Sequence, residues 1–129
     1  VTSKPERLAA LFPDIQACPG ATLLAVQADV SQASEVAKVL ALARALPHPI
    51  RGVLHVAGIS IDVMLDDGLS SKDLQAVGGS KALGAWHLHE QTLAGGDPVE
   101  HFVVVSSVAS LIGGRGRSAY CAANAHLDA

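Results

Sequence analysis

Four polar side chains have types and spacings that could serve a reaction. Ser107 ends an apolar run, Tyr120 follows thirteen positions later, Asn124 comes four residues after Tyr120, and Lys81 lies in the helical region before that run. Taken singly, each has an ordinary structural explanation, such as a loop-capping serine or a half-buried tyrosine. Residues four apart share a helix face, so Asn124 would line whatever Tyr120 contacts. Because α/β sheets place ligand sites at strand ends, the joint arrangement favours a site built from hydrogen-bond donors.

The elements that must position these residues alternate along the chain. Apolar, β-rich runs predict three strands, and apolar residues spaced by three or four predict the helices between them. Ser31 has the type of a helix N-cap. The predicted strands are 22–30, 51–56 and 101–107, and the predicted helices are 31–46, about 71–93, and from about 118 onward. This order is typical of right-handed βαβ crossovers, so we expect an α/β fold with a Rossmann-like, doubly wound parallel sheet.

The composition agrees with this fold and excludes some functions. The chain has 129 residues, of which 50% are hydrophobic, 16% charged and 3% aromatic. A core of Val, Leu, Ile and Ala is typical of parallel strands covered by helices on both faces. The formal net charge of -3 gives no basic field for a nucleic acid. The longest charge-free apolar stretch, 102–114, is shorter than the roughly 18 residues that a membrane-spanning helix needs.

The cysteines and histidines predict neither disulfides nor a metal site. Cys18 and Cys121 have no partner at ligand spacing, so we expect reduced thiols and a cytoplasmic location. His87 and His89 are two apart on a predicted helix and therefore point in different directions, which excludes a metal-binding pair at helical spacing.

Several stretches resemble the ketoreductase domains of polyketide synthases and animal-type fatty acid synthases, a branch of the short-chain dehydrogenase/reductase superfamily. Free-standing members of that superfamily usually read Y-x-x-x-K, whereas this chain has Tyr120 and Asn124 at those positions and its lysine at Lys81. This exchanged arrangement is typical of synthase ketoreductases. The matching stretches are ADV (28–30), GVLHVAG (52–58), SKALGAWHLHE (80–90), FVVVSSVASLIG (102–113) and YCAANAHLDA (120–129).

The resemblance implies a reaction and a set of partners. The reaction is the NADPH-dependent reduction of a β-ketoacyl thioester, held on an acyl carrier protein, to the β-hydroxyacyl thioester, with neighbouring synthase domains as further partners. Ser107 and Tyr120 would donate hydrogen bonds to the carbonyl oxygen, which gains negative charge in the transition state. Tyr120 would also give the proton, and Lys81 would be the cation that favours its release. Lys81 would additionally hold the nicotinamide ribose, and Asn124 would order a water or the lysine in a proton relay.

The same resemblance assigns four further residues to the cofactor. Asp29 would contact the adenine ring, with the Val30 backbone beside it. Ala57 and Gly58 would let the backbone approach the cofactor ribose, because a small or missing side chain is required there. Each assignment has a structural alternative: Asp29 has the type of a helix-start carboxylate, and Ala57 with Gly58 could merely turn the chain out of the sheet.

One part of a dinucleotide site has no counterpart in the sequence. Such a site needs a glycine-rich turn between the first strand and the first helix, but the glycine-rich segment here, 113–116, follows the serine strand. We therefore expect residues 1–129 to be the central βαβαβα segment of a ketoreductase domain, without the first βαβ segment and the C-terminal strands. On its own this segment is expected to be inactive.

Two other interpretations stay open at this point. The first is a non-catalytic structural Rossmann subdomain of such a synthase, against which the presence of all four candidate catalytic residues counts. The second is a free-standing short-chain dehydrogenase, against which Asn124 counts because a lysine would be expected there.

Overall fold

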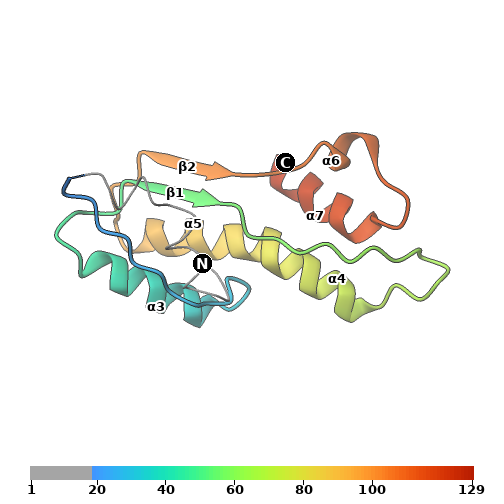
Figure 1. Ribbon diagram of the computed structural model, residues 1–129, viewed down its shortest axis with the longest axis horizontal. Coiled ribbons are helices and arrows are strands. Elements are labelled where there is room, and N and C mark those ends of the chain that lie inside the picture. Colours follow the sequence, from blue (N-terminus) through green and yellow to red (C-terminus); the bar gives the residue numbers. More distant parts are fainter. Residues whose placement is uncertain (1–18) are drawn as a thin grey trace.

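The computed structural model describes residues 19–129 as a parallel α/β unit. Both strands point toward the end of the molecule where α6 and α7 lie (Figure 1). The elements are α3 (Ala33–Arg44), β1 (Gly52–His55), α4 (Ser71–Gly78), the π-helical turn η1 (Gly79–Leu83), α5 (Gly84–Ala94), β2 (His101–Val104), α6 (Ala109–Ile112) and α7 (Ser118–Asp128). The Rossmann-like α/β class is therefore confirmed, with a two-stranded sheet in this part of the chain.

The sheet pairs β1 and β2 in parallel, with Leu54 opposite Val103 and His55 opposite Val104. The Val105 N–H donates to the His55 carbonyl at 3.0 Å, so the pairing continues one residue past β2. A parallel pair needs a crossover connection, which α4, η1 and α5 provide. Both strands lie within the predicted runs 51–56 and 101–107.

The described residues cover the two faces of this sheet unequally. His55 is buried and Phe102 half-buried on the side that faces α5, whereas Leu54 and Val103 on the other side are 68% and 48% exposed. Successive side chains of a strand point to opposite faces, and α5 packs on β1 from one side. Within residues 19–129, helices therefore cover one face of this sheet and leave the other open.

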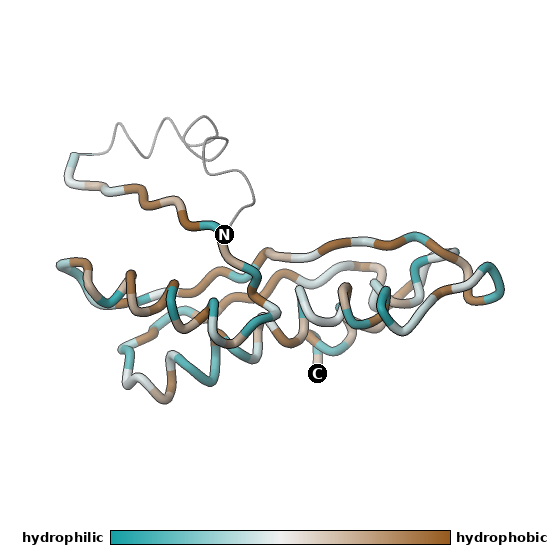
Figure 2. Tube along the Cα trace, turned by 90° about the horizontal axis from the view of Figure 1, so that it is seen from below, coloured by the Kyte–Doolittle hydropathy of each residue, from teal (hydrophilic) through white to brown (hydrophobic). Residues whose placement is uncertain are grey.

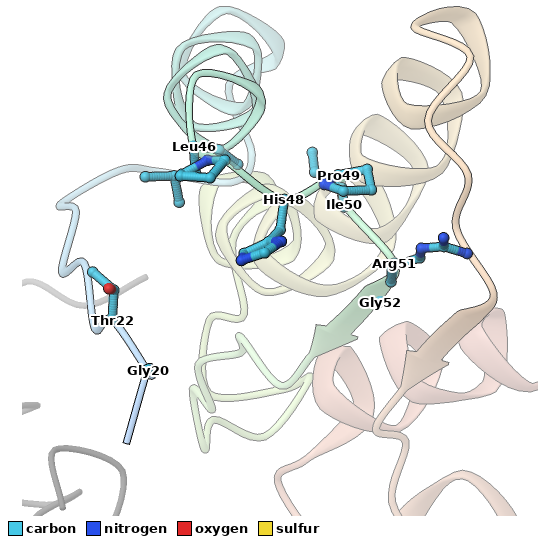
Figure 3. A pocket seen from close by; sticks show the side chains of 10 residues that line it. Gly20, Thr22, Leu46, His48, Pro49, Ile50, Arg51 and Gly52 are labelled. Carbon is cyan, nitrogen blue, oxygen red and sulfur yellow. The ribbon is translucent and has the colours of Figure 1, made fainter. Parts of the chain in front are cut away.

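The segment 22–30, predicted to be a strand, forms none in the structure. Residues 21–29 carry no regular secondary structure, and an open hollow of about 650 Å³ lies between Thr22 and the start of β1 (Figure 3). Figure 2 shows this apolar segment apart from the sheet. A strand requires a neighbour that completes its backbone hydrogen bonds, and consecutive strands of a doubly wound sheet are not always neighbours. Apolar periodicity indicates a candidate strand but says nothing of its partner.

The start of α3 also differs from the prediction. The N-cap is Gln32, without a side-chain cap, instead of Ser31. The Ser31 N–H donates to the Asp29 carboxylate at 2.9 Å, and the Asp29 N–H donates to Glu35 Oε2 at 2.6 Å. Carboxylates thus satisfy two backbone donors just before the helix, whereas a serine cap would have accepted an N–H group of the first helical turn.

The region predicted as one helix over 71–93 has three parts. α4 begins with a reciprocal capping box, in which the Ser70 hydroxyl accepts the Asp73 N–H and the Asp73 carboxylate accepts the Ser70 N–H. The backbone then widens into η1 before it continues as α5. A π-helical turn of this kind is rare and occurs frequently at functional sites.

Two glycines let this helical region lie directly on the segment that precedes α3. A Cβ on Gly79 would lie 3.1 Å from Ser31 Cβ, and a Cβ on Gly84 would lie 2.8 Å from Val30 Cγ2. Neither glycine has a positive φ, so the requirement is for space rather than for a special backbone conformation.

Two buried clusters hold the helices together. One joins Val30 to the buried residues of α3, and Ala57 packs against it. The other packs Val77 of α4 against Ala119 and Ala123 of α7, which fixes the helix that carries Tyr120. Among residues 19–129, no helix is long and apolar enough to cross a membrane.

Candidate active site

Lys81 is buried at the carboxyl ends of the two strands. Its side chain belongs to η1 and is 4% exposed, and its Nζ donates to the Val105 carbonyl at 2.9 Å. A buried ammonium group needs acceptors, and this carbonyl supplies one. The stem passes over Gly58, where an added Cβ would lie 2.8 Å from Lys81 Cε. The missing side chain at Gly58 therefore makes room for the lysine.

Tyr120 is half-buried in the first turn of α7, beside two cations. Lys81 Nζ lies 5.6 Å from the centre of the tyrosine ring, and Arg117 Cζ lies 5.1 Å from it. Both distances fall within the range of cation–π contacts. The structure thus brings together Lys81 and Tyr120, which are far apart in the sequence.

Asn124 is fully buried one turn after Tyr120. Its Nδ2 donates to the Tyr120 carbonyl at 2.7 Å, while its Oδ1 is buried without a hydrogen-bond partner among residues 19–129. Buried acceptors are seldom left unpaired in native proteins. The Ser106 hydroxyl donates to the Asn124 carbonyl at 3.2 Å, which ties α7 to the segment after β2.

Ser107 is half-buried in the link between β2 and the short helix α6, which the sequence pattern did not predict. Its Oγ accepts the Ala109 N–H at 3.2 Å, so the residue also has the loop-capping role that was its structural alternative. α6 packs against α7, so the link before α6 and the helix α7 lie at the same end of the molecule (Figure 1).

The predicted cofactor residues have different surroundings. Asp29 is exposed and its carboxylate accepts the Ser31 N–H, which is the helix-start role. Val30 is buried against Gly84, and Ala57 is half-buried against the first core cluster. Gly58 directly adjoins one of the candidate catalytic residues, Lys81.

The sequence analysis did not predict a set of contacts between two loops beside Tyr120. The Arg117 guanidinium donates to Asp62 Oδ1 at 3.2 Å, the Ser60 hydroxyl donates to the same oxygen at 2.6 Å, and the Val63 N–H donates to the Gly116 carbonyl at 2.8 Å. The Ser60 hydroxyl, followed by Arg117, lowers the pKa of Asp62 below its usual value. The contacts of Arg117 with Asp62 and of Gly116 with Val63 join the loop after β1 to the loop before α7. No local pattern could have indicated these two contacts, because their partners are distant in the sequence.

The sequence analysis also passed over His55. This imidazole is 3% exposed, and its Nε2 lies 3.0 Å from the Lys81 carbonyl oxygen. Burial lowers the pKa of His55 below its ordinary value. A signal was present, because His55 interrupts the otherwise apolar run GVLHVAG.

Metal-ligating side chains do not gather in the described part of the chain. Within residues 19–129 there is no group of three or more His, Cys, Asp or Glu side chains that could hold a metal ion. Cys121 is a free, half-buried thiol, and Cys18 lies outside the described residues.

This parallel α/β unit has the fold of a solved short-chain dehydrogenase from Mycobacterium avium, which matches with a TM-score of 0.74 and 22% identity over 92% of this chain and 42% of that chain. The sequence model of the KR domain matches residues 2–129. The chain therefore belongs to the KR family, the ketoreductase domains of polyketide synthases.

Known proteins agree with this assignment. The spectinabilin polyketide synthase system protein NorB of Streptomyces orinoci is 37% identical over 124 residues, which are 96% of this chain and 6% of that protein. Polyketide synthase GfsA of Streptomyces halstedii is 44% identical over 114 residues, 85% of this chain and 1% of that protein. The solved structure of PlmKR1, the ketoreductase from the first module of phoslactomycin biosynthesis in Streptomyces sp. HK803, matches with a TM-score of 0.80 and 32% identity, over 93% of this chain and 27% of that chain. The chain thus spans a small part of its relatives.

Proposed function

We propose that this chain takes part in the NADPH-dependent reduction of a β-ketoacyl thioester, carried by an acyl carrier protein, to the β-hydroxyacyl thioester. Neighbouring synthase domains would be its other partners and the cytoplasm its location. The observation that carries the proposal is the buried lysine of η1, which faces the Tyr120 ring at 5.6 Å while Asn124 occupies the position one turn after the tyrosine.

The residues at this site fit the nicotinamide ribose of the cofactor. Lys81 offers a cation, Asn124 offers a buried Oδ1 with no partner among residues 19–129, and Gly58 leaves the backbone bare beside the lysine. Asp29 and Val30 are proposed for the adenine end, and Ala57 with Gly58 for the ribose. When bound, NADPH supplies the hydride that adds to the carbonyl carbon.

The protein's own groups act on the carbonyl oxygen. As the carbon is reduced, negative charge develops on this oxygen, and the Ser107 and Tyr120 hydroxyls donate hydrogen bonds to it. The Tyr120 hydroxyl transfers its proton to the oxygen, which completes the alcohol. The Lys81 ammonium stabilises the phenolate that remains, and Asn124 helps to order the path by which a proton returns from solvent to the tyrosine.

Replacement of the tyrosine tests the chemical step. In the natural full-length polypeptide, Tyr120→Phe keeps the ring and its packing but removes the proton donor. We expect the turnover of a β-ketoacyl thioester to fall by about 10²- to 10⁴-fold while the affinity for NADPH changes little. Cys121→Ala, at the next position of α7, is the control and should leave turnover unchanged. Near-normal turnover of Tyr120→Phe would refute the assignment and favour a structural role for the chain.

Replacement of the lysine tests cofactor contact. Lys81→Ala removes both the cation and the ribose contact, so the KM for NADPH should rise and kcat should fall together. Lys72→Ala, which removes an exposed lysine of α4, is the matched control. A defect of Lys81→Ala in kcat alone would mean that Lys81 does not touch the cofactor.

A further inference from the structure

His55 holds the main chain of the residue that carries the site's buried cation. The imidazole projects from the last residue of β1, and its Nε2 lies 3.0 Å from the Lys81 carbonyl oxygen. A carbonyl oxygen only accepts hydrogen bonds, so Nε2 carries the proton in this contact. Burial lowers the pKa of His55, which favours the neutral ring with its single N–H directed at the carbonyl.

This contact falls on the irregular turn of the helix. Lys81 is the central residue of η1, where the ladder of hydrogen bonds shifts from the α-helical to the π-helical spacing. At the end of the turn the Gly84 N–H is shared between the Gly79 and Lys81 carbonyls. The Lys81 carbonyl thus belongs to a turn with irregular hydrogen bonding, and the His55 N–H is a donor to it from outside the helix.

Close packing leaves the imidazole little freedom. A Cβ on Gly84 would lie 3.0 Å from His55 Cε1, so the ring is wedged between β1 and the start of α5. The other parts of the lysine are also fixed by the strand ends. The aliphatic stem of Lys81 lies against Gly58, and the Lys81 ammonium donates a hydrogen bond to the Val105 carbonyl. The main chain, stem and head of Lys81 thus each have one contact at the carboxyl edge of the sheet.

We propose that His55 is a positioning residue for Lys81. Its Nε2–H bond to the Lys81 carbonyl fixes η1 against β1 and thereby sets where the lysine ammonium lies beside Tyr120. The inference rests on the proposed function, because it assumes that the Lys81 ammonium engages the cofactor.

Two substitutions in the natural full-length polypeptide test this role. His55→Leu removes the donor, whereas His55→Gln keeps an N–H2 group at the distance from the backbone where Nε2 lies. We expect His55→Leu to raise the KM for NADPH about tenfold and to lower kcat, because small displacements of a catalytic group reduce the rate steeply. His55→Gln should recover most of both parameters.

A control substitution in α5, the helix that continues from η1, separates an effect on the position of Lys81 from an effect on the stability of the fold. Thr92 is 3% exposed and donates its hydroxyl to the Leu88 carbonyl at 2.7 Å, so Thr92→Val also removes a buried hydrogen bond to a helix carbonyl. Thr92→Val should lower the melting temperature without a change in KM. If His55→Leu fails to fold, His55→Asn replaces it, since its shorter amide does not reach the Lys81 carbonyl and should raise KM where His55→Gln does not.

The outcomes distinguish the two proposals. If Lys81→Ala raises the KM for NADPH but His55→Leu, or His55→Asn in its place, leaves it unchanged, the positioning role is wrong and the proposed function stands. If Lys81→Ala itself leaves KM unchanged, the cofactor contact in the proposed function is wrong, and the role of His55 falls with it.

Discussion

Gly58→Ala should disturb the lysine without disturbing the fold. Gly58 does not have a positive φ, so alanine can adopt its backbone conformation. The added Cβ would lie 2.8 Å from Lys81 Cε and 3.2 Å from Lys81 Cγ. The flexible stem must therefore yield by about half an ångström to reach ordinary van der Waals contact.

The displacement has a calculable effect on the site. The stem leads to the Nζ that donates to the Val105 carbonyl at 2.9 Å, and a shift of the stem moves this ammonium relative to Tyr120. A misplacement of about 1 Å can reduce a rate by about a hundredfold, so a shift half as large should reduce kcat/KM by about tenfold. The substitution also reduces the conformational entropy of the unfolded chain. This effect favours the folded state by about 0.4 to 1 kcal/mol and offsets part of any loss of stability.

The assay compares two glycines of the same segment. The natural full-length polypeptide is assayed for NADPH-dependent turnover of a β-ketoacyl thioester, and its thermal unfolding is recorded in parallel. Gly52→Ala is the control, because its Cβ would meet nothing closer than the His101 carbonyl oxygen at 3.7 Å. A kcat/KM of Gly58→Ala equal to that of Gly52→Ala would refute the reasoning that Gly58 makes room for a working lysine.

Two further predictions concern stability. Gly84→Ala places a Cβ 2.8 Å from Val30 Cγ2 and should destabilise the fold by about 1 to 3 kcal/mol in chemical denaturation. Gly78→Ala is the control, because its Cβ meets nothing within 4 Å, and it should be neutral or stabilising. Equal effects of the two substitutions would contradict the close packing of α5. The Arg44 guanidinium lies 2.6 Å from the Asp97 carboxylate and lowers the pKa of Asp97. This pair should therefore stabilise the fold at pH values above the ordinary pKa of aspartate, about 3.9. The stabilisation should be lost as the pH falls through the lower pKa that Asp97 has in the folded protein. Asp97→Asn should therefore lower the melting temperature near neutral pH, and this deficit should shrink in acid; a deficit independent of pH would exclude the ionic contribution.

The sequence alone was enough to predict the elements that depend on local pattern. The runs around Leu54 and Val103 are strands because β-branched and apolar residues follow one another there, and Tyr120 and Asn124 share a helix because their spacing is helical. The exchanged positions of Lys81 and Asn124 are a property of the sequence itself, and the family assignment agrees with the resemblance that they carry.

Tertiary structure decided what depends on partners distant along the chain. Residues 22–30 have the composition of a strand, but strand pairing needs a neighbour, and none of the described residues provides one. The turn η1 at Lys81 follows no local signal that we recognised. It coincides with the close approach that Gly79 and Gly84 allow to Ser31 and Val30.

The depth and surroundings of the lysine were likewise beyond the reach of pattern analysis. The sequence predicted that Lys81 lies in a helical region, whereas its contacts with His55 and the Val105 carbonyl arise only when β1, β2 and η1 meet. Helical periodicity is set by neighbours along the chain, but a buried charge is placed by whatever acceptors and space the folded chain leaves for it. The sequence therefore determined which groups are present, and the fold determined which of them touch.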